Sequence, residues 1–254
     1  MKILIFGGTT EGRELASKLA SCGHEVTVSV ATGTGEDELC GIPDIKVVTG
    51  RRDASGMEAF LHNKDLCVDA THPYAVEAGK NIREASERTG VRFIRLLREY
   101  TGDLPEYEGC TYVEDAALAA KAASGISGNI LLTTGVKELP FFEGIERKRL
   151  FVRILPVWDS LEKCSEAGIP AGNIIAMHGP FCEELNLALI RQFDISCMVT
   201  KDGGVNGGFP EKFHAASKAG IRLIVIKRPF EEGFVAKEVI DMINSSENCT
   251  LRDV

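Results

Sequence analysis

Residues 7–12, Gly-Gly-Thr-Thr-Glu-Gly, have the spacing of a dinucleotide-binding turn and directly follow a short apolar run. Glycines allow a tight turn, and the N–H groups at the start of a following helix can bind a pyrophosphate. Thr9 replaces the middle glycine of the usual motif; its hydroxyl could donate to a phosphate oxygen, but its Cβ limits the approach of the backbone. Glu11 would repel a phosphate, so we expect it on a ribose hydroxyl or turned away, with Arg13 as a counter-charge. The alternative is a tight turn without a ligand.

The sequence leaves the choice between NADH and NADPH open. The acidic residue that usually binds the ribose 2′-hydroxyl at the end of the second strand is missing, because Val30 is followed by Ala-Thr-Gly. Arg51 and Arg52 follow the next apolar run and could meet a 2′-phosphate. A solvated surface pair explains these two arginines equally well.

The segment Thr71-His72-Pro73-Tyr74 follows another apolar run and places a proline where a helix can begin. An imidazole titrates near neutral pH and can act as a general acid or base. His72 is therefore the candidate proton donor. The alternative is an ordinary turn that starts a helix.

Two segments in the second half of the chain offer small side chains and backbone donors suited to carboxylates or phosphates. They are Thr133-Thr134-Gly135 and residues 201–208, Lys-Asp-Gly-Gly-Val-Asn-Gly-Gly. Lys201 favours an anionic ligand, although a glycine-rich run can also be a flexible connection. Arg153 has the fork that binds a carboxylate with two hydrogen bonds, or it is an exposed arginine. The chain has no GxSxG or HExxH motif, which disfavours hydrolases.

These segments need strands and helices to position them, and short apolar runs alternate with amphipathic stretches almost throughout the chain. Such alternation predicts βαβ units and parallel sheets. The expected strands are 3–6, 26–30, 45–48, 66–68, 93–97, 130–132, 150–154, 174–177, 195–199 and 223–226. The last helix is expected at about 235–243, followed by a polar, frayed tail.

The alternation breaks at 99–110, where proline, glycine and charged residues are typical of a linker. We therefore predict an α/β protein with two Rossmann-like parallel-sheet domains, 1–100 and 101–254. The candidate segments each follow a predicted strand, and the carboxyl ends of parallel strands form the ligand-binding edge of such sheets. We expect the ligands to bind in a cleft between the two domains.

Composition narrows the classes of protein. The 254 residues are 44% hydrophobic and 26% charged, as in packed globular proteins, and no apolar run reaches the roughly 18 residues of a membrane span. We expect a cytoplasmic protein with reduced, mostly buried thiols and no metal site, because no two of the eight cysteines form a CxxC pair. The net charge of −8 and the lack of a basic tract argue against nucleic acid as a partner.

Taken together, the motifs resemble the precorrin-6A reductases of cobalamin biosynthesis, including their cobalt-precorrin relatives. The resemblance covers nearly the whole chain. It is carried by residues 7–13 (Gly-Gly-Thr-Thr-Glu-Gly-Arg), 69–75 (Asp-Ala-Thr-His-Pro-Tyr-Ala), 132–135, 153–156 (Arg-Ile-Leu-Pro), 179–181, 184–186, 200–208 and 228–229. One departure is Gly203, where the family usually has a serine.

The resemblance implies hydride transfer from NADPH or NADH to a ring carbon of a polycarboxylate tetrapyrrole. The residues expected at the cofactor are Gly7, Gly8, Thr9, Thr10, Glu11, Gly12, Arg13, Thr71 and Tyr74. Those expected at the substrate are Thr133, Thr134, Gly135, Lys137, Arg153, Gly179, Pro180, Phe181, Lys201, Gly204 and Gly207. The remaining alternatives are another NAD(P)-dependent oxidoreductase and a non-catalytic nucleotide- or tetrapyrrole-binding module. The oligomeric state is left open.

Overall fold

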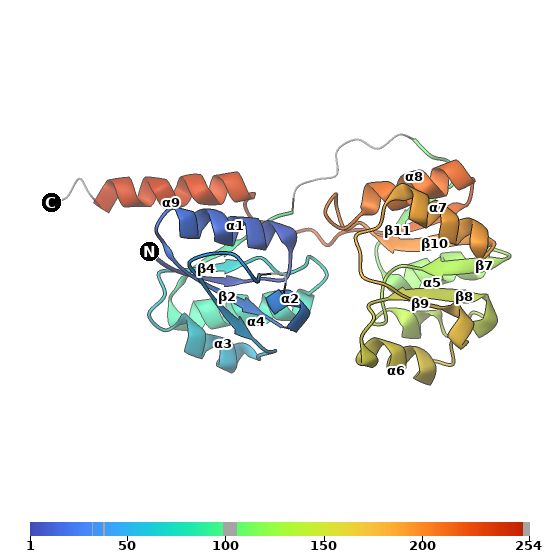
Figure 1. Ribbon diagram of the computed structural model, residues 1–254, viewed down its shortest axis with the longest axis horizontal. Helices are drawn as coiled ribbons and strands as arrows, with labels where there is room; N and C mark the ends of the chain where they lie inside the picture. Colours follow the sequence, from blue (N-terminus) through green and yellow to red (C-terminus); the bar gives the residue numbers. More distant parts are fainter. Residues whose placement is uncertain (32, 38, 99–105, 251–254) are drawn as a thin grey trace. The chain divides into compact units, whose positions relative to one another are not determined.

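The chain divides into two compact units in a computed structural model that describes residues 1–31, 33–37, 39–98 and 106–250 (Figure 1). The first unit consists of Met1–Glu99 and Pro229–Val254, and the second of Tyr100–Arg228. Each unit contains one parallel sheet with helices, which confirms the predicted α/β class. The linker predicted at 99–110 lies mostly outside the described residues.

The first unit is built on a five-stranded sheet with the order β3-β2-β1-β4-β5. Every neighbouring pair is parallel, and the central β1 pairs with β2 and β4. Its strands are β1 (Lys2–Phe6), β2 (Glu25–Val30), β3 (Ile45–Thr49), β4 (Leu66–Asp69) and β5 (Arg92–Arg95). Its helices are α1 (Thr10–Ser21), α2 (Gly33–Asp37), α3 (Ala54–Leu61), α4 (Val76–Thr89) and α9 (Ala236–Thr250).

Alternate residues of β1 supply two hydrophobic cores, one on each face of the first sheet. Ile3 and Ile5 pack with α1, whereas Leu4 and Phe6 pack on the other face with residues of α3 and α4. A strand buried on both faces has no polar side to alternate with, which is why β1 appears in the sequence as a continuous apolar run.

The C-terminal segment returns to the first unit, so the predicted second domain, 101–254, is wrong for its last residues. Phe234 pairs in parallel with Leu96, and Val239 and Ile243 of α9 are buried against the core that includes α1. Figure 1 shows α9 lying alongside α1. The helix also extends to Thr250, beyond the frayed end expected after residue 243. Sequence order suggested the second domain because nothing in the local pattern says which core a helix covers.

The second unit contains a six-stranded parallel sheet with the order β6-β11-β10-β7-β8-β9. Its strands are β6 (Cys110–Val113), β7 (Asn129–Leu132), β8 (Leu150–Ile154), β9 (Ile174–Ala176), β10 (Ile195–Lys201) and β11 (Arg222–Ile226). Its helices are α5 (Ala116–Ser124), α6 (Trp158–Glu166), α7 (Glu183–Gln192) and α8 (Phe209–Ala219), with 3-10 turns at Leu139–Phe142, Arg147–Arg149 and Ala171–Asn173. The analysis of the sequence missed β6, a short and partly exposed edge strand in which Tyr112 is 47% exposed.

A buried ion network in the first unit joins β4, β5 and the returning segment. The Arg95 guanidinium lies 2.8 Å from Asp69 Oδ1 and 2.7 Å from Glu231 Oε1, and it donates to the Thr71 carbonyl at 2.9 Å. Thr71 also donates its N–H and its hydroxyl to Asp69 Oδ1. The network therefore fixes the chain immediately after β4.

The seven cysteines whose side chains the structure describes are all free thiols. Three are buried, three are exposed and one is half-buried, so the expectation of mostly buried thiols holds only in part. Burial raises the pKa of Cys67 and of Cys197 to about 12, which leaves both as unreactive thiols. None of the described helices combines the length and the apolar character needed to cross a membrane.

Replacing Ile243 by alanine tests the assignment of α9 to the first core. Ile243 is 1% exposed, so its truncation leaves a cavity and lowers the free energy of unfolding by about 2–5 kcal/mol. Urea unfolding followed by circular dichroism measures the change, with Lys237→Ala on an exposed position of α9 as the control. Equal stabilities of the two variants would contradict the packing of α9.

Replacing Arg95 by methionine tests the ion network. The substitution leaves Asp69, whose side chain is 3% exposed, without its cation, and we expect a loss of about 3–5 kcal/mol in the free energy of unfolding. The matched control is Arg88→Met, which breaks the exposed ion pairs with Glu58 and Glu84 in the same unit. A loss for Arg95→Met no larger than that for Arg88→Met would show that the network does not stabilise the fold.

Candidate functional site

The strand order of the first unit brings the two N-terminal motifs to one edge of the sheet. In this sheet β2 and β3 lie on one side of β1, and β4 and β5 lie on the other, so the direction of strand order reverses between β1 and β4. Open α/β sheets bind ligands at such a switch point. The glycine turn 7–12 follows β1, and the segment 71–74 follows β4. The candidate site of this unit is therefore the carboxyl edge of β1 and β4.

The glycine turn has the backbone that a close ligand requires. Gly8 has φ +127°, a conformation that other residues rarely adopt, and a Cβ placed there would have no atom within 4 Å. Gly12 allows close packing of α1, because a Cβ there would lie 2.7 Å from the Cβ of Ala70. The turn thus presents open space on one side and a tight helix–strand contact on the other.

Thr9 caps α1 instead of pointing its hydroxyl hydrogen at a ligand. Its Oγ1 accepts from the Gly12 N–H at 3.1 Å and donates to the Ala70 carbonyl at 3.0 Å. The expectation that this hydroxyl donates to a phosphate is therefore wrong for the conformation observed. Among the described residues, none accepts a hydrogen bond from the N–H of Gly8 or Thr10, and these N–H groups lie at the start of the helix.

The charged residues of the turn are arranged so that the acid is neutralised. Glu11 is buried and its Oε1 lies 2.9 Å from Nε of Arg98, so its charge is compensated within the unit. This matches the expectation that Glu11 turns away from a phosphate. Arg13 is half-buried and lines a small recess together with Gly7, Gly8 and Thr9.

Only one of the two arginines after β3 is left for a ligand. The Arg52 guanidinium donates to the carbonyls of Gly50 and Thr49 at 2.7 and 3.2 Å and lies 4.2 Å from the centre of the Phe60 ring. Arg51 is exposed and makes no ion pair with the described residues.

His72 lines a cavity of about 510 Å³ in the first unit. Its Nδ1 accepts a hydrogen bond from the Tyr74 N–H at 3.3 Å, and the two rings lie 5.5 Å apart between centres. An Nδ1 that accepts carries no proton, so this contact favours the neutral imidazole with its hydrogen on Nε2. In this geometry His72 is a hydrogen-bond donor through Nε2, and protonation of Nδ1 would break the contact with Tyr74.

The wall of this cavity combines aromatic and charged side chains. Lys80 and Arg83 of α4 line it, and the Arg83 guanidinium lies 4.6 Å from the centre of the Phe93 ring. Phe230, which is 89% exposed, lines it from the returning segment. Thr71 lies at the cavity too, but its hydroxyl is bonded to Asp69.

The second unit has its own switch point, between β7 and β10. Thr133 and Thr134 follow β7. The Thr133 hydroxyl donates to the Val199 carbonyl at 3.0 Å, whereas the Thr134 hydroxyl is buried and has no hydrogen-bond partner among the described residues. Thr134 is thus a candidate ligand contact, and Lys137 is exposed a few residues further on.

Lys201 is less available than expected. Its Nζ lies 2.6 Å from Oε1 of Glu138, which neutralises its charge, and both side chains are 18% exposed.

The glycine-rich loop after β10 does not offer the unpaired donors that the sequence suggested. The N–H groups of Gly203, Gly204, Gly207 and Gly208 all donate within residues 201–208. The expectation that these four glycines offer unpaired N–H groups to an anion is therefore wrong in this structure. The loop is short enough for its small residues to satisfy one another.

Arg153 is buried, not exposed. It is 7% exposed, its Nη1 donates to Asn186 Oδ1 at 2.8 Å, and its guanidinium lies 4.3 Å from the centre of the Phe181 ring. Burial lowers the pKa of Arg153 to about 10, so it stays charged at neutral pH. Phe181 belongs to the segment 179–181 that follows β9, which brings two of the predicted substrate segments together.

The analysis of the sequence missed Lys212, which is buried on α8 and donates from Nζ to the Gly207 carbonyl at 3.1 Å. It also missed Arg95, and it included Asn186 in the family resemblance without predicting that this residue binds Arg153. A lysine in an amphipathic helix normally predicts an exposed position, and no local signal in the sequence marks Lys212 as buried. No group of three or more His, Cys, Asp or Glu side chains in the described ranges is placed to hold a metal ion.

Comparison with known proteins identifies the family of this chain. The model of the family "Precorrin-6x reductase CbiJ/CobK" matches residues 2–247. A cobalt-precorrin-6A reductase of Priestia megaterium is 36% identical, covering 98% of this chain and 99% of the relative. A precorrin-6A reductase of Sinorhizobium sp is 32% identical, covering 89% of this chain and 85% of the relative.

A solved structure described as CobK precorrin-6A reductase has the same fold. It superposes with a TM-score of 0.73 at 24% sequence identity and covers 96% of this chain and 97% of that one. The family model, the relatives and the shared fold all extend over almost the full length. The chain therefore belongs to the precorrin-6x reductase CbiJ/CobK family and is an oxidoreductase.

Proposed function

We propose that the chain reduces precorrin-6A or cobalt-precorrin-6A to the dihydro form with NADPH or NADH as hydride donor. Membership of the reductase family carries the proposal, because relatives of both names match over nearly the whole chain. The glycine turn supports a nicotinamide cofactor, and the cationic edge of the second unit supports an acidic substrate.

The glycine turn fits the pyrophosphate of a dinucleotide. A phosphate needs close access to backbone donors at a helix N-terminus. Gly8 leaves the space open, the N–H groups of Gly8 and Thr10 are available, and Glu11 is neutralised by Arg98. Arg51 is the available cation for a 2′-phosphate, which would favour NADPH.

The edge beside the turn suits the reactive end of the cofactor. When bound, the dihydronicotinamide supplies a hydride, and the chain's residues position it. His72 faces the cavity next to β4 and donates from Nε2, so we assign it to orienting a ligand carbonyl or amide. This role is compatible with the contact between the Tyr74 N–H and Nδ1 of His72.

The carboxylates of the substrate match the second unit. Arg153 offers a charged fork and Thr134 offers an unpartnered hydroxyl, both at the carboxyl edge of the sheet. Saturating a conjugated bond requires a proton as well as a hydride. Because Nδ1 of His72 accepts a hydrogen bond from Tyr74, we assign the proton to water or to a carboxyl group of the substrate.

The direct test is to add precorrin-6A and cobalt-precorrin-6A separately to the protein with NADH and with NADPH, and to follow the absorbance of the reduced nicotinamide. Oxidation that depends on the tetrapyrrole supports the proposal and identifies the preferred pair. Binding of both ligands without oxidation would indicate a binding module, and oxidation with other substrates alone would indicate a different oxidoreductase.

Two substitutions at Gly8 test the pyrophosphate site. Gly8→Asp and Gly8→Asn strain the turn equally, because both side chains meet the same φ of +127°, but only aspartate adds a negative charge. We expect Gly8→Asp to bind NADPH about tenfold or more weakly than Gly8→Asn, since one like charge near a phosphate costs on the order of 1 kcal/mol or more. Fluorescence titration measures both affinities, and equal values would place the pyrophosphate elsewhere.

Two substitutions at His72 separate positioning from proton donation. A glutamine side chain keeps a donor near the place of Nε2, so His72→Gln should retain most of the turnover, whereas His72→Ala should lose about tenfold through the missing hydrogen bond. A proton donor would instead contribute about 10²- to 10⁴-fold, and both variants would lose it. Steady-state turnover with saturating cofactor distinguishes the two roles.

A further inference from the structure

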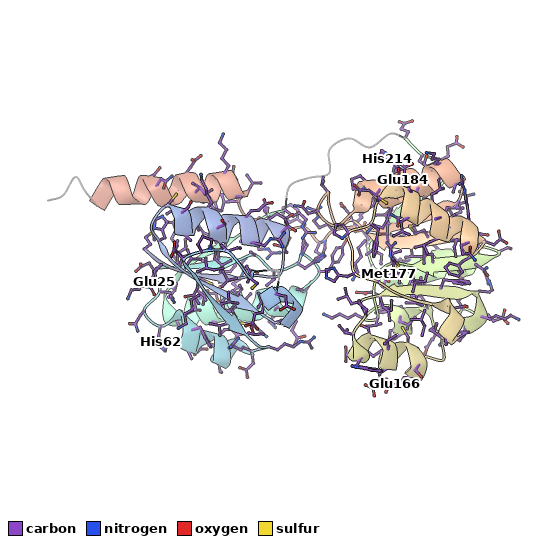
Figure 2. All side chains as sticks on the ribbon, in the orientation of Figure 1. Glu25, His62, Glu166, Met177, Glu184 and His214 are labelled. Atoms are coloured by element: carbon purple, nitrogen blue, oxygen red, sulfur yellow. The ribbon has the colours of Figure 1, made fainter. Side chains whose placement is uncertain are left out.

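Two buried cations lie together in the second unit, and no carboxylate of the described residues is bonded to either. Arg153 of β8 is 7% exposed and Lys212 of α8 is 8% exposed. The outer sides of α7 and α8 carry exposed residues such as Glu184 and His214 (Figure 2), whereas Lys212 is turned into the unit.

Contacts connect Lys212 to Arg153. Lys212 is bonded to Gly207, and a Cβ placed on the next residue, Gly208, would lie 3.8 Å from the Phe181 nitrogen. The Phe181 ring in turn lies against Arg153. The charge of Arg153 also helps to lower the pKa of Lys212.

The Arg153 guanidinium has only neutral partners. These are Asn186 Oδ1 and the ring of Phe181, and no carboxylate of the described residues forms an ion pair with it. None of its nitrogens is among the fully enclosed polar atoms that lack a partner, so the N–H groups that Asn186 does not bind remain accessible. Asn186 therefore binds one nitrogen of the guanidinium, and the remaining nitrogens have no hydrogen-bond partner among the described residues and keep a small exposure to solvent.

Lys212 is held by the glycine-rich loop. Its Nζ donates to the Gly207 carbonyl, and burial together with Arg153 lowers the pKa of Lys212 to about 7. The charges of Glu211 and Asp202 raise the pKa of Lys212, which partly offsets this lowering. Neither carboxylate forms an ion pair with Lys212 among the described residues. Asp202 is bonded to the Gly204 N–H and lies 3.4 Å from Arg228, and Glu211 Oε2 is buried without a hydrogen-bond partner.

Buried charge of one sign is costly unless a counter-ion compensates it. Several other predicted anion ligands in this unit are less available, since Lys201 is paired with Glu138 and the four loop glycines donate their N–H groups within the loop. Arg153, which is charged at neutral pH, and Lys212, which a neighbouring carboxylate would favour in its charged form, are therefore the buried basic groups left for an anion to compensate.

We propose that Arg153 and Lys212 together form the binding site for one carboxylate arm of the substrate. The carboxylate bonds to the open side of the Arg153 fork, and Lys212 supplies the second positive charge while it anchors the glycine-rich loop through Gly207. The proposal rests on the proposed function, which supplies a polycarboxylate ligand. It adds a residue, Lys212, that the motifs did not indicate.

Binding should take up a proton. Above pH 7 the buried Lys212 is mostly neutral, and a carboxylate beside it favours the charged form, so the pKa of Lys212 rises on binding. The affinity for the anion then falls as the pH rises from about 7 toward 10.5, the ordinary pKa of lysine.

The first experiment uses uroporphyrin, a tetrapyrrole with carboxylates on its rim, as the probe. We expect Arg153→Gln and Lys212→Met each to weaken its binding by about 10- to 100-fold. Lys218→Met on the exposed side of α8 and Arg191→Gln on the exposed side of α7 are the matched controls and should bind like the unmodified protein. NADPH affinity should be unchanged in all four variants.

Unchanged uroporphyrin affinity in Arg153→Gln and Lys212→Met would overturn the proposal. If the two substitutions weakened the binding of NADPH and left that of uroporphyrin unchanged, the proposal would also be overturned. The anion bound by Arg153 and Lys212 would then be a phosphate of the cofactor. If the pair controls uroporphyrin binding but the protein does not oxidise NADPH or NADH with either precorrin, the carboxylate site stands and the proposed function fails.

The second experiment needs no variant that might fold poorly. Calorimetric titration of the unmodified protein with uroporphyrin at pH 8, in buffers of different ionisation enthalpy, measures the protons exchanged on binding. We expect uptake of close to one proton, and less at pH 6, where Lys212 is already charged. Binding without proton uptake at pH 8 would overturn the assignment of Lys212. Uptake that persists in Lys212→Met would assign the proton to another group, such as His178, and would also overturn it.

Discussion

One buried arginine determines how the first unit is assembled. Arg95, at the end of β5, binds Asp69 at the end of β4, the Thr71 carbonyl beyond it, and Glu231 of the returning segment. A buried guanidinium must satisfy several donors at once, and here its partners come from separate parts of the chain. The same interaction therefore fixes the turn that carries His72 and brings the segment before α9 back to the first sheet.

Basic side chains that are already paired with groups of the protein serve the fold, whereas those without a carboxylate partner are the candidates for binding an anionic ligand. Lys201 and Arg52 were candidates for binding an anion, but Glu138 and backbone carbonyls already bind them. Arg153 and Lys212 have no carboxylate bonded to them within the described part of the chain. In a chain with an excess of acidic residues, two buried cations without counter-ions are the clearest sign of where an acidic ligand belongs.

Local patterns were sufficient for most of the sheets. Strands buried on both faces are continuous apolar runs, so ten of the eleven described strands were expected close to their observed positions, and the glycine turn after β1 was recognised from its spacing. The edge strand β6 was missed because it is short and partly exposed. The last helix was recognised but assigned to the wrong unit, because an amphipathic stripe shows that a helix packs and not what it packs against.

The sequence by itself determined the α/β class, the order of the elements and the motifs that follow the strands, because these depend on neighbours within a few residues. Tertiary structure alone decided which donors remain available. The Thr9 hydroxyl donates to the Ala70 carbonyl and Lys201 pairs with Glu138, whereas Lys212 is buried inside the second unit. A hydrogen bond or an ion pair depends on what the fold brings within about 3 Å, and residues far apart in sequence supply most of those partners.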